Sequence, residues 1–188
     1  KYRIAIHDLK TKKNEIVFKY GYKNQFQETD LNYPIVAWHP NGEELSYIYE
    51  HRDVIKLVKY KLSNGEKLEQ IVPTDFQRIY SFDYVDDYNY VFSATTKGFS
   101  DLHIYKSKNR NHNSISDDFF DERDIKYTTF NNQKGILFSS NRTVDSLKAL
   151  KYDTILPLGQ FDVFFLADGS SKAINITKTP HISEREPT

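Results

Sequence analysis

Acidic side chains gather at two places in this sequence where their oxygens could bind a cation. Asp83, Asp86 and Asp87 form the first group, and several carboxylates at flexible spacing are ligands that Ca²⁺ prefers. This group lacks the glycine and the alternating Asp and Asn positions of a calcium-binding loop, so we interpret it as a solvated acidic hairpin. Residues 117–124 hold five acids and two Phe. We interpret them as a link between structural units, with both Phe side chains packed inward.

The sequence contains no recognisable catalytic, zinc-binding or phosphate-binding pattern. It has no cysteine, which excludes a thiolate nucleophile, a thiolate metal site and a disulfide. His51, His103 and His112 do not have the spacing of zinc ligands, and His39 has no Ser or carboxylate partner in a catalytic arrangement. With only 7 Gly there is little room for a glycine-rich phosphate loop, and no nucleophile elbow occurs. We therefore expect a protein without enzyme activity, metal or cofactor.

The charge balance argues against nucleic acid as a partner. The formal net charge is +0, whereas binding to phosphates needs an excess of Lys and Arg on one face. The basic run at residues 106–113 is the local exception. The acidic residues 117–124 follow closely and would cancel its field. We therefore interpret the basic run as a solvated loop after a strand rather than a phosphate site.

Targeting and membrane signals are also missing from the sequence. No apolar run approaches the roughly 20 residues that span a bilayer, and no signal peptide is visible. The chain lacks Met and opens on Lys1 inside a predicted strand, so we expect its natural start to lie upstream.

The elements that must position these residues repeat along the chain. Three segments each run from a polar turn into an apolar-aromatic strand: residues 38–47, 82–92 and 130–138. The aromatic residues that end them, Tyr47, Phe92 and Phe138, are 45 and 46 positions apart. Many short runs alternate apolar with polar residues, as half-buried strands do, and no helical period is sustained. A fixed period of about 40–50 residues in an all-strand chain predicts β-propeller blades.

We therefore predict an all-β chain of four-stranded antiparallel meanders, which form about three propeller blades plus two strands of another. The predicted boundaries are 1–30 for the outer strands of a preceding blade and a link, 31–75, 76–120 and 121–180 for three blades, and 181–188 for a link to a next blade. The third blade carries an insertion at residues 141–160, because its third strand arrives late. Strands of the first blade are expected at Ile35–Trp38, 45–50, 55–62 and Lys67–Ile71.

Such an arc cannot close by itself, since propellers typically use about four to eight full blades. An open arc would expose the apolar flanks of its end blades, and exposed apolar patches mark interaction or aggregation surfaces. We expect the arc to be completed by the rest of a longer chain or by a second copy.

The first copy of the repeat carries residues with a structural role. Asn41 and Gly42 tolerate the positive φ of a tight hairpin, and Pro40 fixes its own φ where a strand ends. We expect Trp38 and its equivalents to wedge between neighbouring blades, where large rings bury much apolar area.

This pattern of an aromatic residue, a His-Pro-Asn-Gly turn and an aliphatic-aromatic strand resembles the blade of TolB-like propellers, whose PD40-type repeat is WD40-like. The Ser-Ser-Asn-Arg at residues 139–142 is similar to the Ser-Asn-Arg that ends the second strand of such blades. The Asn-Ile-Thr at residues 175–177 resembles the Leu-Thr that closes a blade. The second copy departs from the pattern, because its turn has no Pro and no Gly. The resemblance covers nearly the whole chain and is specific for fold rather than function.

The resemblance implies a bacterial, periplasmic or envelope-associated protein that binds a protein partner with a face or the mouth of the ring. We expect a non-catalytic interaction or scaffolding module. Loops on a rigid scaffold tend to carry recognition, so the candidate partner-binding residues are Tyr152, Leu156 and Leu158 in the insertion, which could equally pack onto the blade. Two alternatives stay open: the substrate-gating propeller of a serine peptidase of the prolyl-peptidase or tricorn type, and a glycan-binding module.

Overall fold

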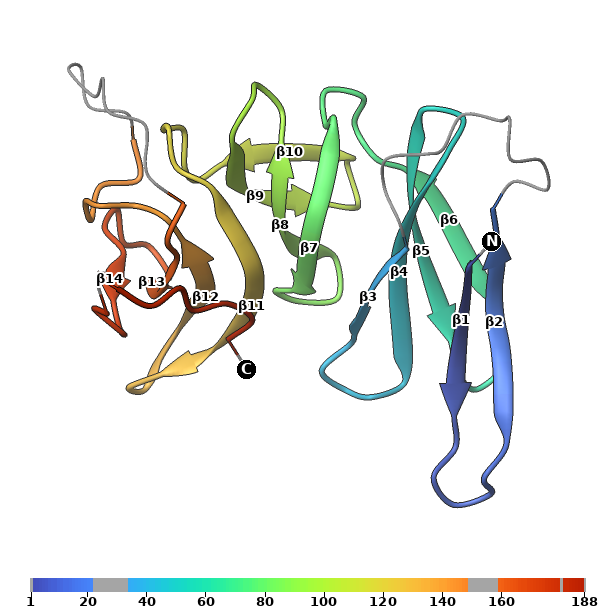
Figure 1. The fold of residues 1–188 in the computed structure, drawn as a ribbon. Helices are drawn as coiled ribbons and strands as arrows, with labels where there is room; N and C mark the ends of the chain where they lie inside the picture. Colours follow the sequence, from blue (N-terminus) through green and yellow to red (C-terminus); the bar gives the residue numbers. More distant parts are fainter. Residues whose placement is uncertain (1, 22–33, 149–158, 180, 188) are drawn as a thin grey trace. The chain divides into compact units, whose positions relative to one another are not determined.

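The computed structural model describes residues 2–21, 34–148, 159–179 and 181–187. These residues form strands, turns and bends but no helix. The strands make one two-stranded and three four-stranded antiparallel sheets, each with its strands in sequence order (Figure 1). The chain divides into two compact units, the first unit (Lys1–Val72) and the second unit (Pro73–Thr188).

The first unit contains a two-stranded ribbon and the first four-stranded sheet. The ribbon pairs β1 (Tyr2–His7) with β2 (Asn14–Tyr20), and the sheet contains β3 (Ile35–Trp38), β4 (Glu44–His51), β5 (Val54–Lys61) and β6 (Lys67–Ile71). The four strands predicted for the first blade are therefore present, with every end within one residue of its prediction.

Alternating apolar residues bind the ribbon to one face of this sheet. The shared core consists of side chains from β2, β4 and β5: Val17, Leu45, Tyr47, Tyr49, Val58 and Tyr60. The ring of Phe18 in the ribbon lies 4.8 Å from the ring of Tyr47 and 4.6 Å from that of Tyr49. Aromatic contacts of this kind stabilise a pair beyond the apolar area they bury.

The turn between β3 and β4 is tight, as predicted, but positive φ occurs at Gly42 and not at Asn41. Gly42 donates its amide hydrogen to the carbonyl oxygen of His39 at 2.8 Å, and Gly42 has a φ of 74°. Asn41 accepts a hydrogen bond from the amide of Glu43 at 2.9 Å. Pro40 thus occupies the second position of the turn, where its fixed φ is favourable.

Trp38 corrects one expectation. Its side chain is 47% exposed rather than wedged in a core. The alternation along β3 turns Ala37 inward and leaves Val36 and Trp38 on the outer side, so the inward position is held by a small residue. Tyr47, Phe92 and Phe138, which end the three copies of the repeat, are buried.

The second unit contains two four-stranded sheets. The second sheet contains β7 (Arg78–Tyr84), β8 (Asn89–Thr95), β9 (Ser100–Lys106) and β10 (Asn111–Ser114), and the third contains β11 (Glu122–Phe130), β12 (Gln133–Ser140), β13 (Asp162–Ala167) and β14 (Ile174–Asn175). The predicted insertion therefore falls between the second and third strands of the third sheet. Asn131 and Asn132 have φ values of 48° and 64°, as a two-residue hairpin turn between β11 and β12 requires.

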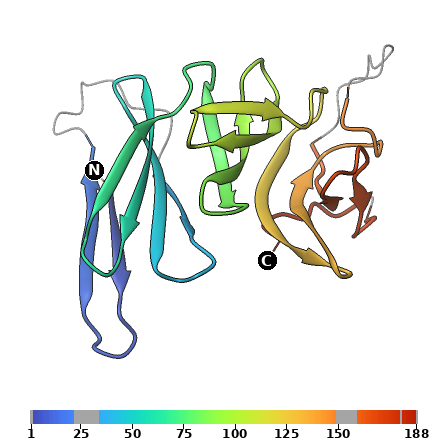
Figure 2. The same cartoon turned by 180° about the vertical axis from the view of Figure 1, so that it is seen from behind.

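A common core joins these two sheets. β11 packs against β7 and β8, and the two sheets lie side by side in both views (Figures 1 and 2). The core contains residues of both sheets and of the insertion: Val91, Leu102, Ile125, Ile136, Phe138, Leu147, Phe164, Leu166 and Ala173. The described beginning of the insertion is thus part of the fold, because Leu147 is only 3% exposed.

The close packing of a glycine on β12 against β13 allows a test of the packing of the third sheet. A Cβ atom at Gly135 would lie 2.2 Å from the carbonyl oxygen of Leu166 and 2.9 Å from the Cα atom of Ala167. We expect Gly135→Ala to lower the free energy of unfolding by at least about 2 kcal/mol, because backbone atoms cannot make room cheaply. The exposed neighbour Lys134 is the control, and Lys134→Ala should cost less than about 0.5 kcal/mol. Urea unfolding of the chain measures both, and equal stability of the two variants would contradict this packing.

Candidate functional site

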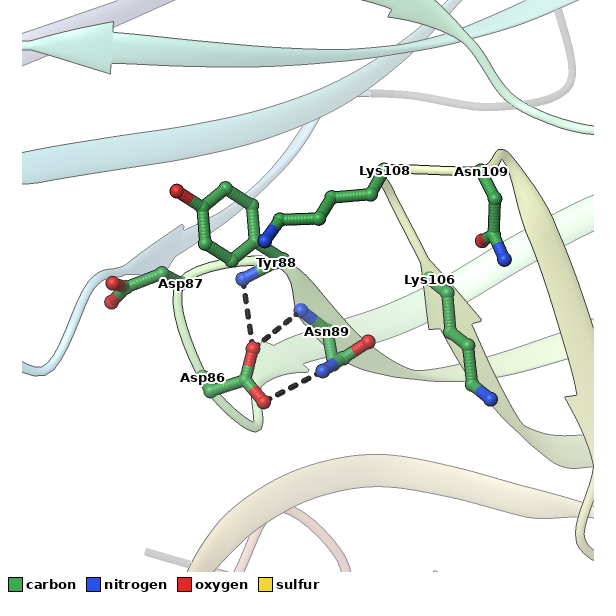
Figure 3. Close-up of a pocket in the computed structure, with 7 residues that line it drawn as sticks. All are labelled: Asp86, Asp87, Tyr88, Asn89, Lys106, Lys108 and Asn109. Carbon is green, nitrogen blue, oxygen red and sulfur yellow. Dashed lines mark hydrogen bonds between the residues drawn. The ribbon is translucent and has the colours of Figure 1, made fainter.

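Two turns at one end of the second sheet form an open pocket, here called the Tyr88 pocket (Figure 3). The first turn connects β7 to β8 and the second connects β9 to β10. Ser107 ties them together, since both its amide and its hydroxyl donate to the carbonyl oxygen of Tyr88 at 2.8 Å. The pocket has a volume of about 510 Å³ and is lined by Asp86, Asp87, Tyr88, Asn89, Lys106, Lys108 and Asn109.

Asp86 fixes the shape of the first turn. One carboxylate oxygen accepts hydrogen bonds from the amides of Tyr88 at 2.8 Å and Asn89 at 2.9 Å, and the other accepts from the Asn89 side chain at 2.6 Å. Burial alone would raise the pKa of Asp86, but these hydrogen bonds outweigh it and the pKa is lowered. The carboxylate is therefore ionised at neutral pH and occupied by its own turn.

Tyr88 and two lysines provide the accessible groups of the pocket. The Tyr88 side chain is 46% exposed, and the Lys108 amine lies 3.7 Å from the centre of its ring. That distance is within the range of a cation–π contact. Within the described ranges, neither the Lys106 amine nor the Lys108 amine forms an ion pair with a carboxylate.

The other end of the second sheet carries a buried charge cluster, here called the Arg142 network: Asp101, Asp118, Glu122 and Arg142. One terminal nitrogen of Arg142 donates to Asp118 at 3.0 Å and also to Glu122, and the other donates to the carbonyl oxygen of Ser146 at 2.6 Å. Ser116 connects Asp101 to Glu122 through its hydroxyl, with distances of 3.1 and 2.8 Å.

Among the described residues, the Arg142 network contains three carboxylates and one guanidinium group. The pKa of Asp101 is raised to about 7 by burial and by the nearby charge of Asp118, against the hydrogen bond from Ser116. Burial raises the pKa of Glu122 to about 8, although the charge of Arg142 opposes the shift. Three carboxylates share one guanidinium group, so the network retains a proton near neutral pH.

The network joins the second sheet to the third. The three acids each place an oxygen within 4.8 Å of the others, as metal ligands do. The guanidinium of Arg142 already supplies a cation between Asp118 and Glu122. Ser93 and Ser100, both from the second sheet, also donate to the carbonyl oxygen of Glu122 in β11. These contacts hold the second and third sheets together.

The first acidic group is not a solvated hairpin throughout, which corrects the sequence interpretation. Asp83 is 5% exposed and accepts from the amide of Tyr127 at 3.0 Å, with the Lys126 amine at 3.3 Å. Asp86 supports its turn, and Asp87 lies at the pocket rim. The structure therefore gives the three acids separate positions.

The acidic link was also only partly predicted. Phe120 is buried as expected, but Phe119 is 40% exposed. Asp118 and Glu122 were interpreted as loop residues, and both lie in the Arg142 network. The Ser-Asn-Arg at the end of β12 was the available signal, because a buried Arg needs acidic partners.

The basic run at residues 106–113 and the acidic residues 117–124 lie on either side of the end of β10. The turn of the basic run lies at the pocket end of β10, whereas the acidic link follows the opposite end of that strand. Asp118 and Glu122 in the link are paired with Arg142. The carboxylates nearest to Lys106 and Lys108 are those of Asp86 and Asp87 in the pocket, and the charge of Lys108 contributes to the lowered pKa of Asp86.

Of the other candidate residues, the structure describes His39 but not those of the predicted recognition loop. Tyr152, Leu156 and Leu158 of the predicted recognition loop lie outside the described residues. His39 is a buried turn residue, and its ring accepts from the amide of Asn41 at 3.2 Å.

Two of the histidines come together although their spacing gave no sign of it. The Nδ1 atoms of His103 and His112 are 3.3 Å apart, and His112 donates its Nε2 hydrogen to Asp75 at 2.7 Å. Burial lowers the pKa of His103 to about 4, so its ring is neutral. A neutral His103 ring fits a hydrogen bond between the two Nδ1 atoms.

Removing Arg142 should destabilise the chain strongly. Arg142→Met leaves two carboxylates buried without their cation, and we expect a loss of about 3–5 kcal/mol in the free energy of unfolding. Arg185→Met is the matched control, because Arg185 pairs with Asp124 at 2.6 Å while 46% exposed. That exposed pair should contribute less than about 1 kcal/mol. Urea unfolding that gives equal losses for both variants would contradict the assignment.

The network also predicts a pH dependence. The folded-state pKa values of Asp101 and Glu122 lie above those of the unfolded chain. The folded state therefore binds more protons, so the stabilisation is complete below the ordinary values of 3.8 and 4.5, declines as pH rises, and is lost above about 7 to 8. Asp101→Asn cannot ionise and should make this decline shallower. The exposed Asp87→Asn should leave it unchanged, and an unaltered slope in Asp101→Asn would refute the shared proton.

Comparisons with known proteins identify the fold. No protein-family model matches the sequence, and no curated protein matches it significantly. Among solved structures, TolB from Acinetobacter baumannii is similar, with a TM-score of 0.63 and 14% sequence identity over 94% of this chain and 37% of that chain. The chain therefore spans little more than a third of that protein's length. Identity this low shows a shared fold alone. The predicted fold is confirmed: three four-stranded sheets and a two-stranded sheet match part of the TolB propeller.

Proposed function

We propose that this chain is a non-catalytic interaction or scaffolding module of a bacterial cell-envelope protein, which binds a protein partner through turns at its blade ends. One observation carries the proposal. Among the described residues, the acids of the Arg142 network are buried and bonded to Arg142 and Ser116, while the open pocket offers carboxylates, amines, amides and an aromatic ring. These side chains can contact the surface of a partner protein. They do not include a nucleophile beside a general base, which covalent catalysis requires.

The TolB-like fold supports the same proposal. Propeller blades hold turns on a rigid core, and rigid scaffolds with variable loops commonly serve recognition. The periplasmic location is part of the proposal and rests on the likeness to TolB. Within the described ranges, no helix is long and apolar enough to cross a membrane.

A protein partner is favoured over a glycan by the state of Tyr88. Sugar rings stack on a free aromatic face, and the Lys108 amine already lies 3.7 Å from the centre of this ring. A sugar would have to displace that contact. The peptidase alternative needs a catalytic domain outside this sequence, and no contact in the described geometry favours it.

Site-directed photocrosslinking in cells tests the proposal. A photoreactive amino acid replaces Tyr88 at one end of the second sheet or Phe119 at the other, in the full-length gene product. Leu9, which is 76% exposed in the turn between β1 and β2, is the control. We expect a discrete protein adduct from position 88 or 119 that is absent from position 9, and the identified partner should bind the purified chain. No adduct from either blade end, or turnover of a substrate by the chain, would refute the proposal.

A further inference from the structure

Two histidines and an aspartate meet at the edge of the second sheet. His103 lies in β9 and His112 in β10, and the pairing of these strands makes the two residues diagonal neighbours on one face. Asp75 comes from the link before β7. The ring of Phe76 lies 5.1 Å from the His103 ring and 4.2 Å from the His112 ring. Both imidazole rings are therefore held in place by packing.

The hydrogen bonds of the two rings leave a pair of nitrogens facing each other. His112 donates its Nε2 hydrogen to Asp75 at 2.7 Å, and a carboxylate accepts rather than donates, so Nδ1 of a neutral His112 ring carries a lone pair. The Nδ1 atom of His103 lies 3.3 Å away. A hydrogen on that atom would bridge the two rings. It would also leave Nε2 of His103 with a bare lone pair.

That lone pair on Nε2 of His103 would have no donor. The atom is buried and has no hydrogen-bond partner of normal geometry among the described residues. Burial lowers the pKa of His103, whereas the backbone of Ala94 raises it, as a hydrogen-bond acceptor does. Ala94 therefore supplies no donor to Nε2. A buried acceptor without a donor costs free energy, so the bridged arrangement is not the only one that this geometry suits.

A metal ion between the two Nδ1 atoms would use both lone pairs. Zn²⁺ binds imidazole nitrogens at about 2.0–2.1 Å in tetrahedral geometry, which places two ligand nitrogens about 3.3–3.4 Å apart. The Nδ1 atoms of His103 and His112 are 3.3 Å apart. Neighbouring ligands of a square-planar ion would be only about 2.8–3.0 Å apart at the same bond lengths. Asp75 holds the second nitrogen of His112, as carboxylates commonly do for metal-bound histidines.

The surroundings of the histidine pair suit a cation. Asp75 and Asp117 place negative charge near His103. Within the described ranges, neither carboxylate forms an ion pair with Lys or Arg. The neutral His103 ring has no competing proton to lose before it binds a metal. The His112 side chain is 16% exposed, so an ion can reach the pair from that side and water can take the remaining positions.

We propose that His103 and His112 bind a Zn²⁺ ion through their Nδ1 atoms, with Asp75 as the positioning residue that orients the His112 ring. The inference goes beyond the proposed function, because it needs no protein partner. The ion would fasten β10, the edge strand of the second sheet, to β9 and, through Asp75, to the link before β7. A ligand that binds only the folded state stabilises it, so Zn²⁺ should also raise the midpoint of thermal unfolding.

Isothermal titration calorimetry with ZnCl₂ tests the site in the purified, metal-free chain without a polyhistidine tag. We expect one Zn²⁺ per chain with a Kd below about 100 μM. His103→Gln and His112→Gln should each weaken binding about tenfold or more, because each removes one of two ligands. Asp75→Asn should weaken it about tenfold and keep the stoichiometry. The exposed His7→Gln in β1 is the control and should change the affinity less than about twofold.

Nitrogen NMR of the unmodified chain gives a readout that does not depend on how the variants fold. With histidine labelled at both ring nitrogens, Zn²⁺ should shift the Nδ1 signals of His103 and His112. The Nε2 signal of His112 should keep the features of a hydrogen bonded to a carboxylate, since Asp75 remains its acceptor.

Three outcomes would overturn the inference. Failure of the unmodified chain to bind Zn²⁺ in the stated range would leave the two rings joined by a hydrogen bond alone. Equal losses in His7→Gln and His112→Gln would place the ion elsewhere. A shift of Nε2 signals in place of Nδ1 signals would contradict the geometry. None of these results bears on the crosslinking experiment, so failure of the zinc site and failure of the proposed function are distinguishable.

Discussion

Arg142 is the side chain on which the second unit depends. Its guanidinium lies among three buried carboxylates that come from β9, from the link after β10 and from the start of β11, while Arg142 itself follows β12. Buried charges are costly unless each is paired, so the two sheets must keep their relative positions for the network to persist. Burial of apolar side chains between the two sheets stabilises their contact, and the Arg142 network fixes how the sheets are positioned relative to each other. We therefore regard the second and third sheets as one cooperative unit.

The two ends of the second sheet consequently have different structural roles. At one end, acids and Arg142 neutralise each other inside the protein, and Arg142 and Leu147 hold the beginning of the insertion against the core. At the other end, Ser107 and Asp86 fix two turns and leave two amines and an aromatic ring at the surface. The same meander thus combines a rigid joint with an open recognition surface. This division gives a physical reason to place binding at the pocket end and stability at the network end.

The strands were predictable from the sequence because alternation and a repeat of about 45 residues are local signals. The exact ends of β3 and β6 follow from that pattern. The exposure of Trp38 did not follow, since an aromatic residue at a strand position does not reveal which face is covered. The turn at Arg52 and Asp53 has positive φ at both residues, although only Asp53 is of a type that favours turns. The Tyr88 pocket and the Arg142 network depend on pairings across strands, so spacing along the chain could not show them.

Hydrogen–deuterium exchange of the unmodified chain tests the cooperative unit most directly. Amides in β8 and β9 should share one free energy of opening with amides in β12 and β13, because the core and the Arg142 network must open together. Denaturant should lower the protection of both groups along one common curve. Exchange of the second sheet at a free energy distinct from that of the third would mean that the sheets open independently. That result would contradict the central role assigned here to Arg142.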